Sequence, residues 1–116
     1  MARLTPKFEK HGYLIGELTL QSASTPFQPL KTMYFKGGRV TLDQPPEGGG
    51  FTTVKLIRNF DPDDVIYQTS LINGQTTATL NSEATLSAGD YMSLTVTSLA
   101  NDFAGADLIL SLEYHN

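Results

Sequence analysis

The sequence predicts an all-β protein built as one antiparallel β-sandwich of seven to eight strands. Apolar and polar residues alternate with a period of two in many short segments, as half-buried strands require. Clusters of Gly, Pro, Asn and Asp separate these segments at intervals of about 10 to 14 residues, and no segment carries a convincing helical period. Many short strands with regular turn signals in a chain of 116 residues indicate a jelly-roll-like sandwich.

Period-two alternation places the strands along the chain. They are expected, in order, over residues 13–20, 31–42, 52–60, 65–72, 76–86, 91–98 and 107–114. In the first segment the residues expected on one face are Leu14, Gly16, Leu18 and Leu20. In the last, the expected inward residues are Leu108, Leu110, Leu112 and Tyr114. The segment 76–86 has the weakest pattern of the seven.

Residues that favour turns separate these strands. Gly37-Gly38, inside the second segment, indicates a bulge or a corner. Residues 45–50 form a loop, because proline lacks an amide donor and three glycines are conformationally loose. Residues 61–64, Asp-Pro-Asp-Asp, are predicted as a turn, Asn73-Gly74 as a tight hairpin turn, and residues 100–105 as a loop.

The chain divides into a short arm and one domain. Residues 1–12 are predicted as an N-terminal arm, either frayed or used for docking, and residues 13–116 as a single β-sandwich domain. Within that domain, residues 21–31 carry Pro26 and Pro29 and are expected to form an extended connector.

Composition excludes several classes of function. Eight basic residues against twelve acidic ones give a net charge of −4, which disfavours a nucleic-acid ligand. No apolar run is long enough to span a bilayer, and the N-terminus lacks the apolar core of a signal peptide, so we expect no membrane partner and synthesis in the cytoplasm. Because cysteine is absent, disulfides and thiolate chemistry are excluded.

No motif predicts catalysis, a cofactor or a metal. His11 and His115 approach only if the first and last strands are neighbours, and no third ligand of suitable type accompanies them. The acidic run 61–64 lacks the spacing of a calcium loop. The chain has neither a nucleophile elbow nor a phosphate-binding loop. We therefore expect a protein that is not an enzyme, with no catalytic, cofactor-binding or metal-binding residue.

Exposed apolar residues and N-terminal charges predict a partner interface. Tyr13, Ile15, Ile57, Tyr91 and Ile109 fall on strand faces opposite the expected core, where a monomer favours polar groups. The N-terminal segment adds basic residues and an aromatic anchor. The candidate interface residues are Arg3, Lys7, Phe8, Lys10, Tyr13, Ile15, Tyr91 and Ile109.

The order of motifs from about residue 39 to residue 113 resembles a jelly-roll module of tailed-bacteriophage virions. The residues that carry the resemblance are Val40-Thr41-Leu42 before a Pro-Pro-x-Gly loop, the strand 54–59, Leu86-Ser87-Ala88-Gly89-Asp90-Tyr91 before the strand 92–96, and Ala104-Gly105-Ala106-Asp107 before the strand 108–112. Such modules occur in capsid decoration (cement) proteins, head fibres and tail-fibre tips. Where they often have Asn-Gly after the middle strand, this chain has Asn59-Phe60-Asp61-Pro62, so the local turn is expected to differ.

The resemblance implies a virion structural protein, most simply a capsid decoration protein. It would bind the major capsid protein at the outer capsid surface and stabilise the shell, as a homo-oligomer, a trimer or a dimer. One sandwich without a repetitive shaft favours decoration over a fibre. The alternative is a receptor-binding or carbohydrate-binding module of a phage fibre or tail, with loops 45–50, 60–64 and 100–106 as its ligand surface.

Overall fold

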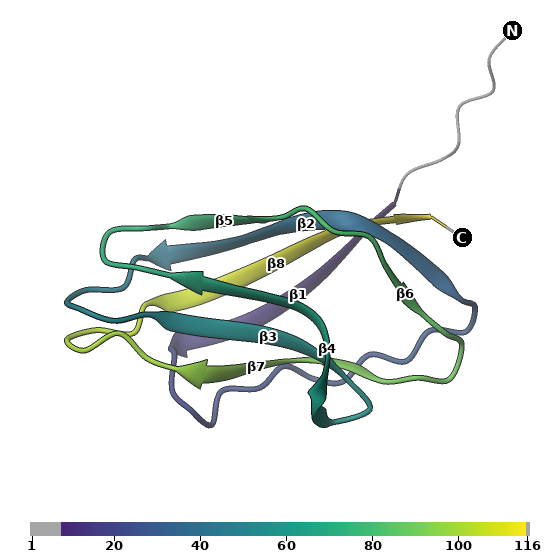
Figure 1. Cartoon of the computed structure of the whole chain (residues 1–116), viewed down its shortest axis with the longest axis horizontal. Helices are drawn as coiled ribbons and strands as arrows, with labels where there is room; N and C mark the ends of the chain where they lie inside the picture. The colour runs from purple at the N-terminus through teal and green to yellow at the C-terminus, as the bar shows by residue number, and fades with distance from the viewer. Residues whose placement is uncertain (1–7, 116) are drawn as a thin grey trace, which may run out of the picture.

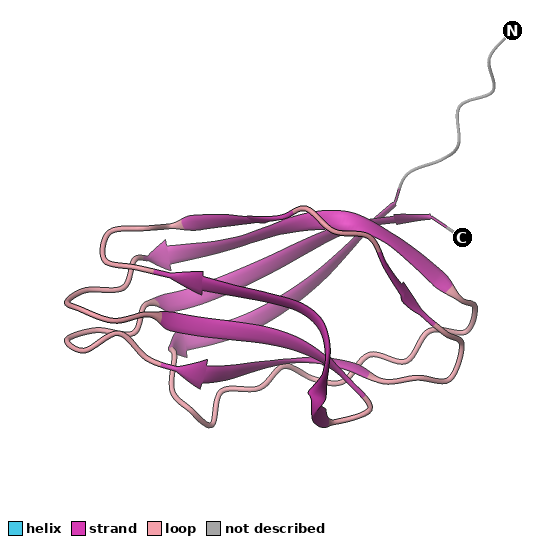
Figure 2. Cartoon of the chain, in the orientation of Figure 1, coloured by secondary structure: helices cyan, strands magenta, loops and turns pink. Residues whose placement is uncertain are grey.

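All regular structure in the described part of the chain is β-strand. The computed structural model describes residues 8–115, and in this range Figure 2 shows strands joined by loops. The strands are β1 (Phe8–Glu17), β2 (Met33–Gln44), β3 (Thr52–Arg58), β4 (Asp61–Leu71), β5 (Thr77–Leu80), β6 (Ala84–Leu86), β7 (Met92–Ser98) and β8 (Ala106–His115). No helix within residues 8–115 is long and apolar enough to cross a membrane. The predicted fold class, an antiparallel jelly-roll-like sandwich of seven to eight strands, is confirmed.

The strands form two antiparallel sheets packed face to face (Figure 1). The larger sheet has the order β1-β8-β2-β5, and β6 pairs with the same edge of β2 as β5, nearer the start of that strand. The smaller sheet has the order β4-β3-β7. β1 and β8 are therefore neighbours, and β1 is an edge strand of the larger sheet.

Alternate residues of both sheets fill the core between them, as the period-two pattern predicted. Leu14, Val40, Leu42, Leu108, Leu110 and Leu112 point inward from the larger sheet; Val54, Leu56, Tyr67, Leu94 and Val96 meet them from the smaller one. Tyr114, expected in the same row, packs against the core while only partly buried. These mainly aliphatic side chains form one core cluster, which also contains the buried ring of Phe35.

β1 differs at both ends from the predicted segment 13–20. It begins at Phe8, because β8 continues to His115 and offers Tyr114 as the partner of Phe8. Residues 8–12 of the predicted arm thus lie in a strand, and residues 1–7 lie outside the described residues. The strand ends at Glu17 after a register shift at Gly16, whose φ is +85°. Leu18, just beyond the strand, is buried as predicted, but the chain turns at Leu20. The prediction that Leu20 faces the core is therefore wrong, and Leu20 is 58% exposed.

The glycine pair of β2 forms the predicted bulge. Phe35 pairs with Tyr114 and Gly37 with Glu113, so one extra residue interrupts the β2–β8 register. A Cβ atom at Gly37 would collide with the carbonyl oxygen of Leu80, and one at Gly38 with that of Ser111. Glycine is therefore required where β2 passes closely between β5 and β8.

The weak segment 76–86 is two strands and not one. β5 pairs with residues 38–41 of β2, and β6 pairs with residues 33–35. The residues between them, 81–83, follow the β2 bulge and leave the ladder. The bulge in β2 thus separates the segment that pairs with it into β5 and β6. Side-chain alternation in the sequence does not show such a break.

The turn predicted at residues 61–64 lies two residues earlier. Arg58 pairs with Asp61, so the β3–β4 hairpin has the two-residue loop Asn59-Phe60, and both residues have positive φ (54° and 59°). Two positive φ values are typical of the hairpin turn whose twist matches that of the strands. Asp61 therefore starts β4, and the prediction of a turn over residues 61–64 is wrong.

The connector between β1 and β2 covers the edge of β7. Phe27 and Met92 exchange two backbone hydrogen bonds of 2.8 Å, and the Leu94 amide donates to Ser24 Oγ at 2.8 Å. At the neighbouring edge of the larger sheet, the Lys10 ammonium lies 4.0 Å from the centre of the Phe27 ring. The extended connector expected for residues 21–31 thus closes one side of the sandwich.

Neighbouring residues on β8 test the assignment of the two faces. Leu110 is 2% exposed and Ile109 is 42% exposed. Leu110→Asp should leave the protein unfolded, because it places a carboxylate in the aliphatic layer. Ile109→Asp should keep the wild-type circular dichroism spectrum and a cooperative urea transition. Equal loss of structure in both variants would contradict this assignment.

Candidate functional site

The outer face of the larger sheet brings together three of the predicted interface residues. Tyr13 on β1 pairs with Ile109 on β8, and Ile109 pairs on its other side with Thr41 on β2. Ile15, two residues beyond Tyr13, is 93% exposed, and Tyr13 is 56% exposed. These outward side chains therefore form an apolar patch of Tyr13, Ile15 and Ile109 that crosses two strands.

The patch borders a groove of about 500 Å³. Its outward lining residues are Tyr13, Ile15, Thr41, Asp43, Asp107 and Ile109, and Thr76 adds a hydroxyl from the loop before β5. The groove lies at the end of the sheet where β1 and β2 finish and β8 begins (Figure 1). A shallow apolar surface of this kind is suited to contact with another chain.

A polar row follows the patch along the same face. His11 Nδ1 lies 3.1 Å from Ser111 Oγ, and His11 Nε2 lies 3.2 Å from a carboxylate oxygen of Glu9. A catalytic triad needs an acid that is buried and holds the histidine in place. The Glu9 side chain is 72% exposed, so the three residues form a surface hydrogen-bond network without that support.

Of the other predicted outward residues, Lys10, Ile57 and Tyr91 do not join the patch. Arg3 and Lys7 lie outside the described residues, and of Phe8 only the backbone pairing is described. Lys10 points toward the connector and covers Phe27. Ile57 is only 7% exposed on the central strand β3, between its partners Val65 and Ser93, so its predicted exposure is wrong.

Tyr91 directly precedes β7 of the smaller sheet and lies beside the β3–β4 hairpin. Its ring is 5.6 Å from that of Phe60, with 34° between the ring planes. Tyr91 is 40% exposed and Phe60 57% exposed, so the two rings form a second aromatic surface. The hairpin is at the end of the sandwich opposite the groove (Figure 1).

Hydrogen bonds from Asn59 hold this hairpin in place. The Tyr91 amide donates to Asn59 Oδ1 at 2.9 Å, the Asn59 amide donates to the Tyr91 carbonyl at 2.8 Å, and Asn59 Nδ2 donates to Asp90 at 3.2 Å. Positive φ is uncommon for a bulky residue such as Phe60 and costs on the order of 1 kcal/mol. The contacts of Asn59 thus hold the hairpin in a shape in which the backbone of Phe60 is strained and its ring is exposed.

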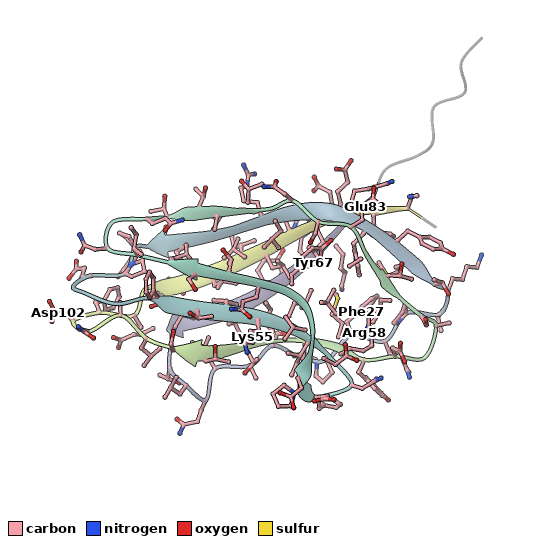
Figure 3. The ribbon with its side chains drawn as sticks, in the orientation of Figure 1. Phe27, Lys55, Arg58, Tyr67, Glu83 and Asp102 are labelled. Atoms are coloured by element: carbon pink, nitrogen blue, oxygen red, sulfur yellow. The ribbon has the colours of Figure 1, made fainter. Side chains whose placement is uncertain are left out.

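Arg58 anchors the base of the same hairpin. Its guanidinium donates to Asp64 at 2.9 Å and to the Thr85 carbonyl at 2.6 Å, and it lies 3.7 Å from Asp90. Figure 3 shows Arg58 far from Asp102, which lies at the other end of the sandwich. The positive charge of Arg58 is therefore paired with two carboxylates inside the fold, and its role is to hold the hairpin.

The outer face of the smaller sheet has a different character. Between the hairpin and the far end, its outward positions are mainly Ser, Thr and Gln, with Lys55 on the central strand (Figure 3). Thr53 Oγ1 lies 2.8 Å from both Ser70 Oγ and Ser98 Oγ. Hydroxyl groups that bond to one another in this way suit contact with water, so the two faces of the sandwich are unlike.

The histidines of the described residues, 8–115, lie on separate strands, and Tyr67 is the titratable group whose pKa is clearly shifted. No three His, Asp or Glu side chains of that range could hold a metal ion together. His11 lies opposite Ser111, and His115 lies opposite Tyr34. Burial raises the pKa of Tyr67, and the charge of Glu83 raises it further, so this hydroxyl stays protonated and donates to the Ser82 carbonyl at 2.8 Å.

Phe60, Asp43 and Asp107 were not singled out from the sequence. Asp43 and Asp107 occupy outward positions near Thr41 and Ile109, and continuing the alternation would have placed them on the same face. The Asp61-Pro62-Asp63 sequence is a stronger turn signal than Asn59-Phe60, so the turn was expected after Phe60. Asn59 was the available clue, since Asn is favoured at the first position of a two-residue hairpin loop.

Solved structures with similar folds include chains of two phage capsids. A chain in the acidic stable capsid structure of Helicobacter pylori bacteriophage KHP30 aligns with a TM-score of 0.57 and 12% identity, covering 94% of this chain and 92% of that one. A chain of the cyanophage Pam1 capsid asymmetric unit aligns with a TM-score of 0.55 and 14% identity, covering 97% and 92%. The resemblance to a phage virion jelly-roll module is thus confirmed at the level of the fold.

An enzyme structure contains a similar domain. The Podospora anserina GH26-CBM35 β-(1,4)-mannanase aligns with a TM-score of 0.51 and 16% identity, and the alignment covers 89% of this chain but 21% of that one. At such identities the likeness concerns the fold alone. No protein-family model matches the chain, and no curated protein matches it in sequence.

Substitution of Asn59 tests the hairpin. Asn59→Gly removes the side-chain hydrogen bonds but tolerates positive φ, and it should lower the free energy of unfolding by about 1 kcal/mol. Asn59→Ala also strains the backbone and should lower it by about 2 kcal/mol. Urea denaturation measures both values. An alanine variant as stable as the glycine variant would contradict the positive-φ turn.

Proposed function

We propose that this protein is a structural component of a bacteriophage virion, a capsid decoration protein that binds the major capsid protein on the outer shell. One observation carries the proposal: the described sandwich corresponds over nearly its whole length to whole chains of two phage capsid structures. Their coverage of 92% means that those chains are modules of the same size, without a large additional domain.

The surface of the sandwich supports the same function. Its core is filled with aliphatic side chains, and the described residues provide no metal-binding cluster. The outer face of the larger sheet has the apolar patch of Tyr13, Ile15 and Ile109, whereas the opposite face is mostly polar. A protein with one apolar and one polar face suits a shell, with the apolar face against neighbouring subunits and the polar face toward water. We propose no catalytic role.

Sedimentation with capsids tests this function. Purified protein mixed with undecorated capsids of its phage should pellet with them and saturate at a fixed ratio to the major capsid protein. Protein that stays in the supernatant at every concentration would rule the function out.

A matched pair of variants tests the face. Ile109→Asp should weaken capsid binding about tenfold or more, because it places a carboxylate in an apolar contact. Thr97→Asp adds the same charge on the polar face and should bind like the wild type. Loss of binding in the Thr97 variant alone would assign the contact to the smaller sheet.

A second candidate function is a carbohydrate-binding or receptor-binding module of a fibre or tail. The Phe60–Tyr91 pair favours it, since exposed rings held rigidly at a loop offer apolar faces for a ligand. The similarity to part of a mannanase points to β-(1,4)-linked mannose as the first ligand to test. The absence of Trp weighs against it.

Titration calorimetry with mannohexaose separates the two functions. A carbohydrate-binding module should bind the sugar, and Phe60→Ala should abolish binding. Phe51→Ala is the matched control, because Phe51 is also 57% exposed but has no ring partner within the described part of the chain. Absence of binding by the wild-type protein would remove this sugar as a ligand.

A further inference from the structure

The groove beside the apolar patch has an acidic rim and lacks a basic group. Its exposed apolar side chains are those of Tyr13, Ile15 and Ile109, and its outward lining includes the carboxylates of Asp43 and Asp107. None of its lining residues is Lys or Arg. The groove therefore favours an extended segment that carries both apolar and positively charged side chains.

The two carboxylates are held on the same side of the sheet. Asp43 and Asp107 lie between the paired positions Leu42–Leu108 and Gln44–Ala106. Asp107 has φ +56° and accepts a hydrogen bond from the Gly16 amide at 2.7 Å, which holds its side chain at the rim. Neighbouring like charges on one face are unfavourable, so a bound cation would stabilise this arrangement.

Residues 1–7 of this protein have the matching composition. The segment, Met-Ala-Arg-Leu-Thr-Pro-Lys, contains two bases and no acid, with Met1 and Leu4 as apolar residues. Pro6 disfavours a helical conformation at the residue before it. An extended segment of seven residues spans up to about 25 Å, which is enough to follow a groove between strands.

The position of β1 favours a neighbour's segment over the chain's own. β1 begins at Phe8, whereas the groove lies at the end where β1 finishes (Figure 1). To reach its own groove, the segment would have to reverse direction and run back along most of β1, which uses nearly all of its length. A segment from a second copy needs no reversal.

We propose that the groove of one copy binds residues 1–7 of a second copy, with Leu4 against Tyr13 and Ile109 and with Arg3 and Lys7 near Asp43 and Asp107. Groove and segment are different surfaces, so the contact is head-to-tail, and a ring of copies closes it. This inference deepens the proposed decoration function by identifying the contact that builds the homo-oligomer.

Charge reversal in the full-length protein tests the contact, with oligomeric mass measured by analytical ultracentrifugation in the absence of capsids. The wild type should self-associate, and salt at about 1 M should weaken this association. Both Asp43→Lys and the double variant Arg3→Glu/Lys7→Glu should weaken it about fivefold or more. Circular dichroism should show that each variant is folded. A wild type that is monomeric at every concentration would overturn the proposal.

Matched controls separate this contact from a general effect of net charge. Asp63→Lys makes the same change as Asp43→Lys at an exposed residue of the opposite end, and Lys31→Glu/Lys55→Glu matches the arm variant. Both controls should associate like the wild type. Controls that dissociate as much as the test variants would overturn the proposal, and so would an arm variant with full association.

Mixing the variants distinguishes exchange between copies from docking within one chain. The arm variant keeps a functional groove, and the Asp43→Lys variant keeps a functional arm, so an equimolar mixture should form a one-to-one complex that neither forms alone. Combining all three substitutions in one chain should restore association. No complex in the mixture would overturn exchange. Because these measurements omit capsids, they are independent of the sedimentation test. The protein can bind capsids without self-association through the groove, and it can self-associate without binding capsids.

Discussion

A single aliphatic layer between two sheets is the constraint on which this structure depends. The chain has no cysteine, so packing replaces disulfides as the main source of stability. Leu108, Leu110 and Leu112 show how tightly the layer is specified, since these three alternate residues of β8 are each at most 2% exposed. The residues between them are forced outward by the same alternation, and this is how Ile109 comes to the surface.

The sandwich is closed at its side and tightly packed at the bulge, and its two outer faces differ in composition. The connector pairs with β7 along one side, and the glycine pair of β2 lets three strands approach closely at the bulge. The outer faces then differ by composition, one with an apolar patch and an acidic groove and the other with hydrogen-bonded hydroxyls. Such a division suits the proposed function as a capsid decoration protein.

The two apolar surfaces lie on different sides of the sandwich and differ in shape. The Phe60–Tyr91 pair is fixed by Asn59 and Arg58, at a cost in backbone strain. The groove is shallow and open along the sheet. A rigid ring pair favours one small site, whereas an open groove with an acidic rim favours an extended basic segment. This contrast is why self-association is assigned to the groove.

The amino-acid sequence by itself determined the fold class, most strand positions, the connector and the bulge at Gly37-Gly38. Each depends on local chemistry, namely side-chain alternation, the missing donor of proline and the small size of glycine. The sequence also placed Tyr13, Ile15 and Ile109 outward, since alternation is a local property. It misplaced Leu20 and the β3–β4 turn, because a register shift and a competing Asp-Pro signal interrupt the local pattern. Only the tertiary structure decided that Tyr13 and Ile109 are neighbours while Tyr91 lies on the other sheet, because strand order and register are set by packing between segments far apart in the chain.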